Sequence, residues 1–278
     1  MPMQLLLAAM IDAPARGVVP HPCPAPVAVP AEVVAWRQRL YAKDRVGTPP
    51  APVEAAARYR AAYDEARKTD WADLCRYAAE NARLANAPMV DRQVVFIGDS
   101  ITEAWSLGDP SLFRHGWINR GISGQTSQQI LLRFEADVVR LHPRVVHILA
   151  GTNDVAGNMG PTSLDAIENN LSAMVALAKA ADIRVVLAAV PPSAAFKWAP
   201  ELKPAPVIAA LNARLRALAT ATGTDFVDYG AVLATPVGAL KPALTYDGTH
   251  PDAHGYDAMR PLVHSAITQA LKRSAPAK

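Results

Sequence analysis

The chain has 278 residues, of which 51% are hydrophobic and only 19% are charged, so it can bury a full core and does not resemble a disordered polymer. Its formal net charge of +3 is small for this length, and no stripe of Lys and Arg is interleaved with aromatic residues. This composition argues against a nucleic-acid partner and favours a small soluble substrate.

The first thirty residues combine a short apolar run with a proline-rich stretch. The run Leu5–Met10 resembles the remnant of a secretory signal peptide, although no Lys or Arg precedes it and Asp12 ends it. Six prolines between Pro14 and Pro30 remove backbone donors and fix φ, which predicts an extended strap on the surface. No other stretch reaches the roughly 20 apolar residues that a bilayer span needs, so we expect no stable membrane insertion.

A helical zone follows the strap. Val33, Trp36 and Leu40 recur at helical spacing, prolines interrupt the pattern at 49–52, and about thirty residues from 54 to 84 are again typical of a helix. We expect these helices to pack against the rest of the protein rather than fold alone. The predicted division is a candidate signal remnant and strap at 1–30, a helical extension at 31–88, and the main domain at 89–278.

Two cysteines are present, Cys23 in the strap and Cys75 in the predicted helix, and neither has metal-type spacing. They are either two unrelated thiols or a disulfide that fastens the strap to the helix, which requires an oxidising compartment. An exported protein accounts for both the apolar start and the cysteine pair. We therefore favour the disulfide and a periplasmic or secreted location, with a cytoplasmic one as the alternative.

From residue 94 onward, short apolar runs alternate with helical periods. Buried strands are predicted at 94–97, 145–149 and 183–187, with a shorter one at 226–228. Alternating strands and helices are typical of a parallel sheet covered on both faces. Ligands of such sheets bind in the crevice at the carboxyl ends of the strands, so the residues that follow each strand are the candidates for chemistry.

Four polar segments lie at these places. Ser100 follows the first strand in Gly-Asp-Ser, Gly124 lies in the loop segment 119–126, Asn153 follows the 145–149 strand, and Asp247 and His250 precede the last helix. Ester hydrolysis requires a nucleophile, a base, a group that orients the base, and hydrogen donors for the oxyanion. We assign these roles to Ser100, to His250, to Asp247, and to the donors of Ser100, Gly124 and Asn153, without a cofactor or metal.

These four segments, in this order, resemble the four sequence blocks of the SGNH hydrolases, also called the GDSL family, over roughly residues 91 to 272. The resemblance implies the same roles for Ser100, Gly124, Asn153, Asp247 and His250. It also implies an α/β fold, a three-layer α/β/α flavodoxin-like sandwich with a parallel central sheet, and no cofactor. The domain at 89–278 is then the catalytic domain, preceded by the strap and helices.

Members of this family act on acetyl esters, lipid esters or acyl thioesters. We expect a serine esterase for short-acyl, O-acetyl esters of a small molecule or glycan. A lysophospholipase or thioesterase acting on longer acyl chains is the alternative, and so is a non-catalytic module that binds an acylated glycan. The sequence gives no prediction of the oligomeric state.

The same residues also fit structural roles. Ser100 alone resembles a helix N-cap, Asn153 an Asx turn, and Asp99 a residue that holds a turn. His147, inside an apolar strand, is typical of a buried core histidine.

His254 lies four residues after His250, so the two with Asp247 could bind a metal on one helix face. Pro251 favours a helix that begins after His250, which argues against that site. Asp252 is a poorer orienting partner than Asp247, because a residue two positions away points elsewhere.

Overall fold

The computed structural model describes residues 17–19 and 22–273. The run Leu5–Met10, on which the signal-peptide prediction depends, and Pro14 lie outside the described residues. From residue 22 to Pro30 the chain has neither helix nor strand, as predicted for the strap. Within the described ranges, no helix is long and apolar enough to cross a membrane.

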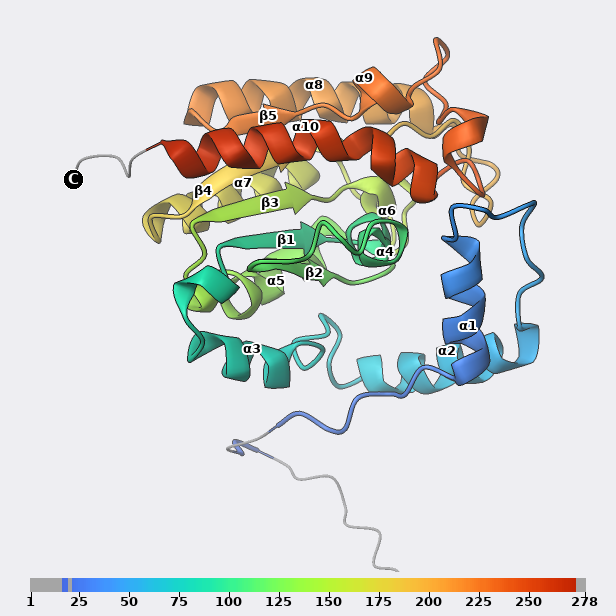
Figure 1. The fold of residues 1–278 in the computed structure, drawn as a ribbon, viewed down its shortest axis with the longest axis horizontal. Coiled ribbons are helices and arrows are strands. Elements are labelled where there is room, and N and C mark those ends of the chain that lie inside the picture. Colours follow the sequence, from blue (N-terminus) through green and yellow to red (C-terminus); the bar gives the residue numbers. More distant parts are fainter. Residues whose placement is uncertain (1–16, 20–21, 274–278) are drawn as a thin grey trace, which may run out of the picture.

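The described chain forms one parallel sheet in the order β2-β1-β3-β4-β5 (Figure 1). Its strands are β1 Val94–Gly98, β2 Trp117–Gly121, β3 Val145–Leu149, β4 Arg184–Ala188 and β5 Asp225–Val227. This is the flavodoxin-like strand order, in which the chain leaves β1 in opposite directions toward β2 and β3. The crevice beyond the carboxyl ends of β1 and β3 is therefore the expected ligand position.

Helices cover both faces of the sheet and complete the predicted three-layer α/β/α sandwich. Successive strand residues point to opposite faces, so Val95 and Ile97 pack in one cluster and Val94 and Phe96 in the other. The first cluster includes α5 Ser127–Asp137, α7 Leu164–Ala180 and α8 Pro204–Thr222. The second includes α4 Ser100–Gly108, α9 Gly230–Leu233 and α10 Ala253–Lys272. The remaining short helix after β3 is α6 Thr152–Val155.

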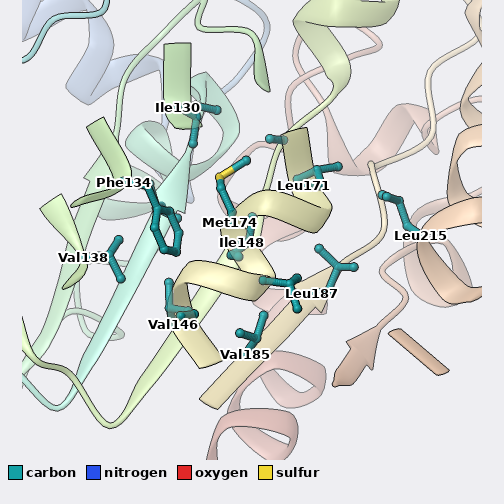
Figure 2. Packing of buried hydrophobic residues seen from close by; sticks show 14 of the residues in the cluster. Ile130, Phe134, Val138, Val146, Ile148, Leu171, Met174, Val185, Leu187 and Leu215 are labelled. Carbon is teal, nitrogen blue, oxygen red and sulfur yellow. The ribbon is translucent and has the colours of Figure 1, made fainter. Parts of the chain in front are cut away.

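Figure 2 shows the first of these cores, where side chains of α5 and α7 meet those of β3 and β4. Phe134 and Met174 lie against Val146 and Ile148 with no exposed surface on any of the four. Strands that are buried on both faces are apolar at most positions, and in β3 only His147 departs from this, which is why their nearly continuous apolar runs were recognisable.

The second strand was missed by sequence interpretation, which placed residues 119–121 in a loop. In the structure Trp117–Gly121 is β2, the edge strand beside β1. Its buried positions include Arg120, whose guanidinium binds Asn81. An edge strand that buries an arginine lacks the apolar run that identifies a central strand.

The N-terminal extension forms α1 Ala31–Leu40, α2 Val53–Arg67 and α3 Ala78–Ala85. The predicted helix over 54–84 is wrong between residues 68 and 77, where the chain turns. The Asp70 carboxylate accepts the backbone N–H groups of Leu74 and Cys75 at 2.7 and 2.8 Å, and Asp73 has a φ of 55°, so the helix cannot continue. Figure 1 shows α1 and α2 on the side of the molecule toward which the arrows of β1 and β3 point.

Cys23 and Cys75 form the favoured disulfide, across 52 residues of chain. Cys75 lies in the turn before α3, so its predicted place in a helix is wrong. The bond fastens the strap to the segment that joins α2 and α3.

Candidate active site

The nucleophile candidate lies on a tight turn between β1 and α4. Asp99 caps α4 by accepting the N–H of Ile101 at 2.9 Å, so Asp99 rather than Ser100 is the N-cap, and Ser100 is the first helical residue. Gly98 lets the end of β1 lie close to β3, because a Cβ there would overlap the backbone oxygen of Leu149. The half-buried Ser100 side chain therefore lies at the carboxyl edge of the sheet, at the helix end where backbone N–H groups have no partner within the helix.

Ser100, His250 and Asp247 form one continuous hydrogen-bonded line. The Ser100 Oγ lies 2.9 Å from the His250 Nε2, and the His250 Nδ1 lies 2.7 Å from the Asp247 Oδ2. With the Nδ1 proton donated to Asp247, the Nε2 lone pair faces the serine hydroxyl. A hydroxyl, an imidazole and a carboxylate thus have the spacing that serine hydrolysis requires of its nucleophile, base and orienting group.

Backbone hydrogen bonds fix the Asp247 carboxylate. Its Oδ1 accepts the N–H groups of Thr249 at 2.9 Å and His250 at 2.8 Å. Burial by itself raises the pKa of Asp247, but the hydrogen bond and charge of His250 outweigh it and hold that pKa below its ordinary value. Asp247 is therefore ionised at neutral pH, and its negative charge lies next to the imidazole of His250.

The loop residue Gly124 and the side chain of Asn153 face the same cleft as Ser100 and His250, which has a volume of about 640 Å³. Gly124 has a φ of +82°, and a side chain at this position would meet no neighbour. Its backbone N–H binds no described residue. The position is thus an open one with a donor available to a ligand.

Asn153 is more constrained than the sequence suggested. Its Nδ2 donates to the Asp99 Oδ2 at 3.2 Å and to the Gln125 carbonyl at 3.0 Å, while its Oδ1 accepts from Asn158 at 2.7 Å. Both amide protons therefore have acceptors before any ligand is bound.

Asp99 has an environment unlike that of Asp247. It has no exposed surface, and burial raises its pKa to about 7 despite the hydrogen bond from the Ile101 N–H. A carboxyl group with this pKa exchanges its proton near neutral pH. The Asp99 carboxyl group accepts a hydrogen bond from Asn153, which lines the cleft, so the protonation state of Asp99 affects this bond.

His254 and Asp252 lie outside this hydrogen-bonded line. The exposed His254 places its Nε2 3.2 Å from the Lys43 carbonyl. Asp252 caps α10, accepting the N–H groups of His254 and Gly255, so the last helix begins after Pro251 as predicted. Neither residue contacts the side chain of Ser100.

His147 is the buried core histidine that its strand position indicated. It has no exposed surface, and its Nε2 lies 2.8 Å from the hydroxyl of Tyr229. Burial lowers its pKa to about 3, so it is neutral at physiological pH.

Sequence interpretation missed a buried arginine that connects the two loops of the site. Arg133 on α5 donates to the Gly98 carbonyl at 2.8 Å, to the Gln125 side chain at 2.6 Å and to Asp137 at 2.8 Å. Its guanidinium thus fixes the turn that precedes Ser100 and the residue whose carbonyl binds Asn153. The available signal was an arginine next to the apolar positions Ile130 and Phe134 of the predicted helix.

Aromatic rings flank the base, and sequence patterns gave no sign of this. The Tyr246 ring is stacked on His250 with centroids 5.7 Å apart, and the Trp198 ring lies 6.0 Å from it. Rings in these positions limit the movement of the imidazole and shape the cleft beside it.

The sequence profile of the GDSL-like lipase/acylhydrolase family matches residues 96–258. No curated protein matches the chain in sequence. Among solved structures, a GDSL-like lipase from Bacteroides thetaiotaomicron VPI-5482 is 47% identical, with a TM-score of 0.69 over 72% of this chain and 98% of that one.

Two further structures are similar. A protein from Bacteroides fragilis NCTC 9343, assigned by inference to the acylhydrolases, is also 47% identical, with a TM-score of 0.70 over 73% of this chain and 99% of that one. An acetyl xylan esterase is 25% identical, with a TM-score of 0.51 over 63% of this chain and 98% of that one.

Proposed function

Because this chain belongs to the GDSL-like lipase/acylhydrolase family, we propose that it cleaves carboxylic esters through an acyl-enzyme on Ser100. The observation that carries the proposal is the line from the Ser100 hydroxyl through His250 to Asp247, with distances of 2.9 and 2.7 Å. A binding module has no need for an imidazole placed to remove the proton of a serine.

The reaction has two steps that use the same groups. His250 Nε2 takes the Ser100 proton as the oxygen attacks the ester carbonyl, and then gives that proton to the leaving alcohol. Water next attacks the acyl-enzyme, again with His250 as base, and releases the acid and the free serine. Asp247 remains ionised throughout and holds the imidazole in the productive orientation.

The oxyanion of each tetrahedral intermediate needs hydrogen-bond donors that point at the former carbonyl oxygen. We assign the backbone N–H groups of Ser100 and Gly124 and the amide of Asn153 to this role. Asn153 would exchange its longer bond, that of 3.2 Å to Asp99, for the bond to substrate. Loss of one such donor costs roughly 10²- to 10³-fold in kcat.

O-acetyl esters of carbohydrate are the proposed substrates. The similar structure of an acetyl xylan esterase supports this choice, and the cleft of about 640 Å³ has room for a saccharide unit. The chain-length profile from acetate to palmitate, followed by assay of acetylated xylan, tests it. A maximum at long acyl chains would instead indicate a lysophospholipase or thioesterase.

We also propose that the protein works in the periplasm or outside the cell. The disulfide between Cys23 and Cys75 supports this location, because such bonds persist in oxidising compartments.

A fluorophosphonate probe tests the catalytic role directly, because it reacts with activated serines. Labelling and hydrolysis of p-nitrophenyl acetate are expected in the wild-type protein and in Ser265→Ala, a matched change at an exposed serine of α10. Both are expected to disappear in Ser100→Ala. Full hydrolysis by Ser100→Ala would refute the acyl-enzyme mechanism.

A further inference from the structure

The N-terminal extension forms one wall of the cleft that contains Ser100. Residues of α1, of α2 and of the turn before α3 line this cleft together with Ser100 and His250. Figure 1 shows α1 and α2 beyond the carboxyl ends of the central strands. The wall therefore faces the part of a substrate that extends away from the reacting ester.

Positive charge exceeds negative charge on the cleft surface. The described residues that line it include four arginines, Arg37, Arg60, Arg67 and Arg76, and two carboxylates, those of Asp64 and Glu103. Arg67 is paired at 3.7 Å with Asp73, which does not line the cleft, so three arginines remain against the two carboxylates. The whole chain, by contrast, has a net charge of only +3. A concave surface with this imbalance attracts anionic ligands.

The imbalance is clear at Glu103, which lies one helical turn after Ser100 on α4. Its carboxylate pairs with two guanidiniums, those of Arg76 at 3.4 Å and Arg37 at 3.5 Å. The same carboxylate also accepts the N–H of Ser123 at 3.1 Å. One negative charge thus serves two arginines, whose side chains stay 32% and 28% exposed and keep further donors for a ligand.

Arg60 on α2 is the third cation of this group. It is exposed, lines the same cleft, and forms no ion pair or hydrogen bond with any described residue. Asp64 follows one turn later on the cleft side, but its carboxylate lies beyond ion-pair distance of Arg60. The Arg60 guanidinium is therefore available to a ligand without breaking an existing bond.

Aromatic rings lie beside these cations. Tyr59 and Tyr63 of α2 are stacked with centroids 5.8 Å apart, and both line the cleft. Trp198 lies on the far side, next to His250. Such rings offer a flat apolar face and a polar edge, which suits sugar rings better than a flexible alkyl chain.

We propose that the ester substrate carries an anionic group held by Arg37, Arg60 and Arg76, and that it is an acetylated saccharide containing a sugar carboxylate. The proposal rests on the esterase function proposed above and specifies its substrate class. An arginine can bind a carboxylate through two parallel N–H···O bonds. The three guanidinium groups therefore favour a ligand with the planar shape of a carboxylate as well as its negative charge.

The test compares an acetylated oligosaccharide that contains a uronic acid with the same compound after reduction of its carboxyl group to an alcohol. We expect the wild-type protein to prefer the acidic compound in kcat/KM, and its KM for that compound to rise with salt. Arg60→Gln should lower the acidic-to-neutral ratio of kcat/KM about tenfold. Arg58→Gln, an exposed arginine of α2 outside the cleft, should leave the ratio unchanged.

Equal kcat/KM for the acidic and reduced compounds, or equal ratios in the wild-type protein and Arg60→Gln, would overturn the proposal. Preference for a lysophospholipid over both saccharides would also overturn it, since the anion would then be a lipid phosphate. These outcomes leave the esterase function intact if p-nitrophenyl acetate is still hydrolysed through Ser100. Absence of that hydrolysis would count against the function itself.

Discussion

The side-chain amide of Asn153 donates to the carboxyl group of Asp99 at 3.2 Å, so a proposed oxyanion donor is bound to a fully buried acid. Burial raises the pKa of Asp99 from its ordinary 3.8 to about 7. Between these two pH values the folded protein retains a proton that the unfolded chain has lost. The contribution of Asp99 to the free energy of unfolding therefore falls as the pH rises from about 4 to about 7.

Replacement of Asp99 by Asn should remove this pH dependence. Between pH 4.5 and pH 8, the free energy of unfolding of Asp99→Asn is expected to rise relative to that of the wild-type protein by about 3 kcal/mol. Urea unfolding at both pH values measures the difference. If the difference in free energy of unfolding between the two proteins does not change with pH, Asp99 ionises with its ordinary pKa.

The two histidines near the start of α10 should differ in their effect on rate. His250→Ala is expected to lower kcat for p-nitrophenyl acetate by roughly 10⁴- to 10⁶-fold, because it removes the base. His254→Ala is the matched control, since the exposed ring of His254 forms its hydrogen bond with the Lys43 carbonyl and none with Ser100, and the rate of this variant should be largely unchanged. A large loss in His254→Ala alone would invert the assignment.

Arg133 should be required for both stability and rate. Arg133→Met leaves the buried Asp137 without its cation and should lower the free energy of unfolding by about 3–5 kcal/mol. Arg133→Lys keeps the positive charge, but a lysine cannot reach the Gly98 carbonyl and Gln125 together. The kcat of its folded fraction should therefore be lower than that of the wild-type protein. Chemical unfolding and initial rates test these points against Arg140→Met, a change at an exposed arginine. Wild-type kcat in Arg133→Lys would show that the network does not position the site.

The disulfide between Cys23 and Cys75 should stabilise the protein. By the chain-entropy relation, closing a loop of 52 residues contributes about 4 kcal/mol to the free energy of unfolding. Reductant, or the double variant Cys23→Ser and Cys75→Ser, should lower the urea midpoint accordingly. Thiol titration of the denatured protein before and after reduction provides the control, and two reactive thiols without reductant would contradict the bond.

The sequence by itself determined the central sheet and the order of the polar segments along it. Val94–Gly98 and Val145–Leu149 are buried on both faces, and such strands are apolar at most positions, with His147 the exception. The residues that follow them, Ser100 and Asn153, are then placed at one sheet edge by the parallel topology alone. Asp247 and His250 are three residues apart, so their proximity could also be predicted from the sequence.

Only the tertiary structure decided what surrounds those groups. The position of α1 and α2 over the cleft depends on contacts between distant segments, and so do the pairing of Glu103 with Arg37 and Arg76 and the bonds of Arg133. The pKa of Asp99 likewise depends on burial that no local pattern records. Long-range packing and desolvation act across the fold rather than along the chain, which is why the candidate site residues could be picked out from sequence and their environment could not.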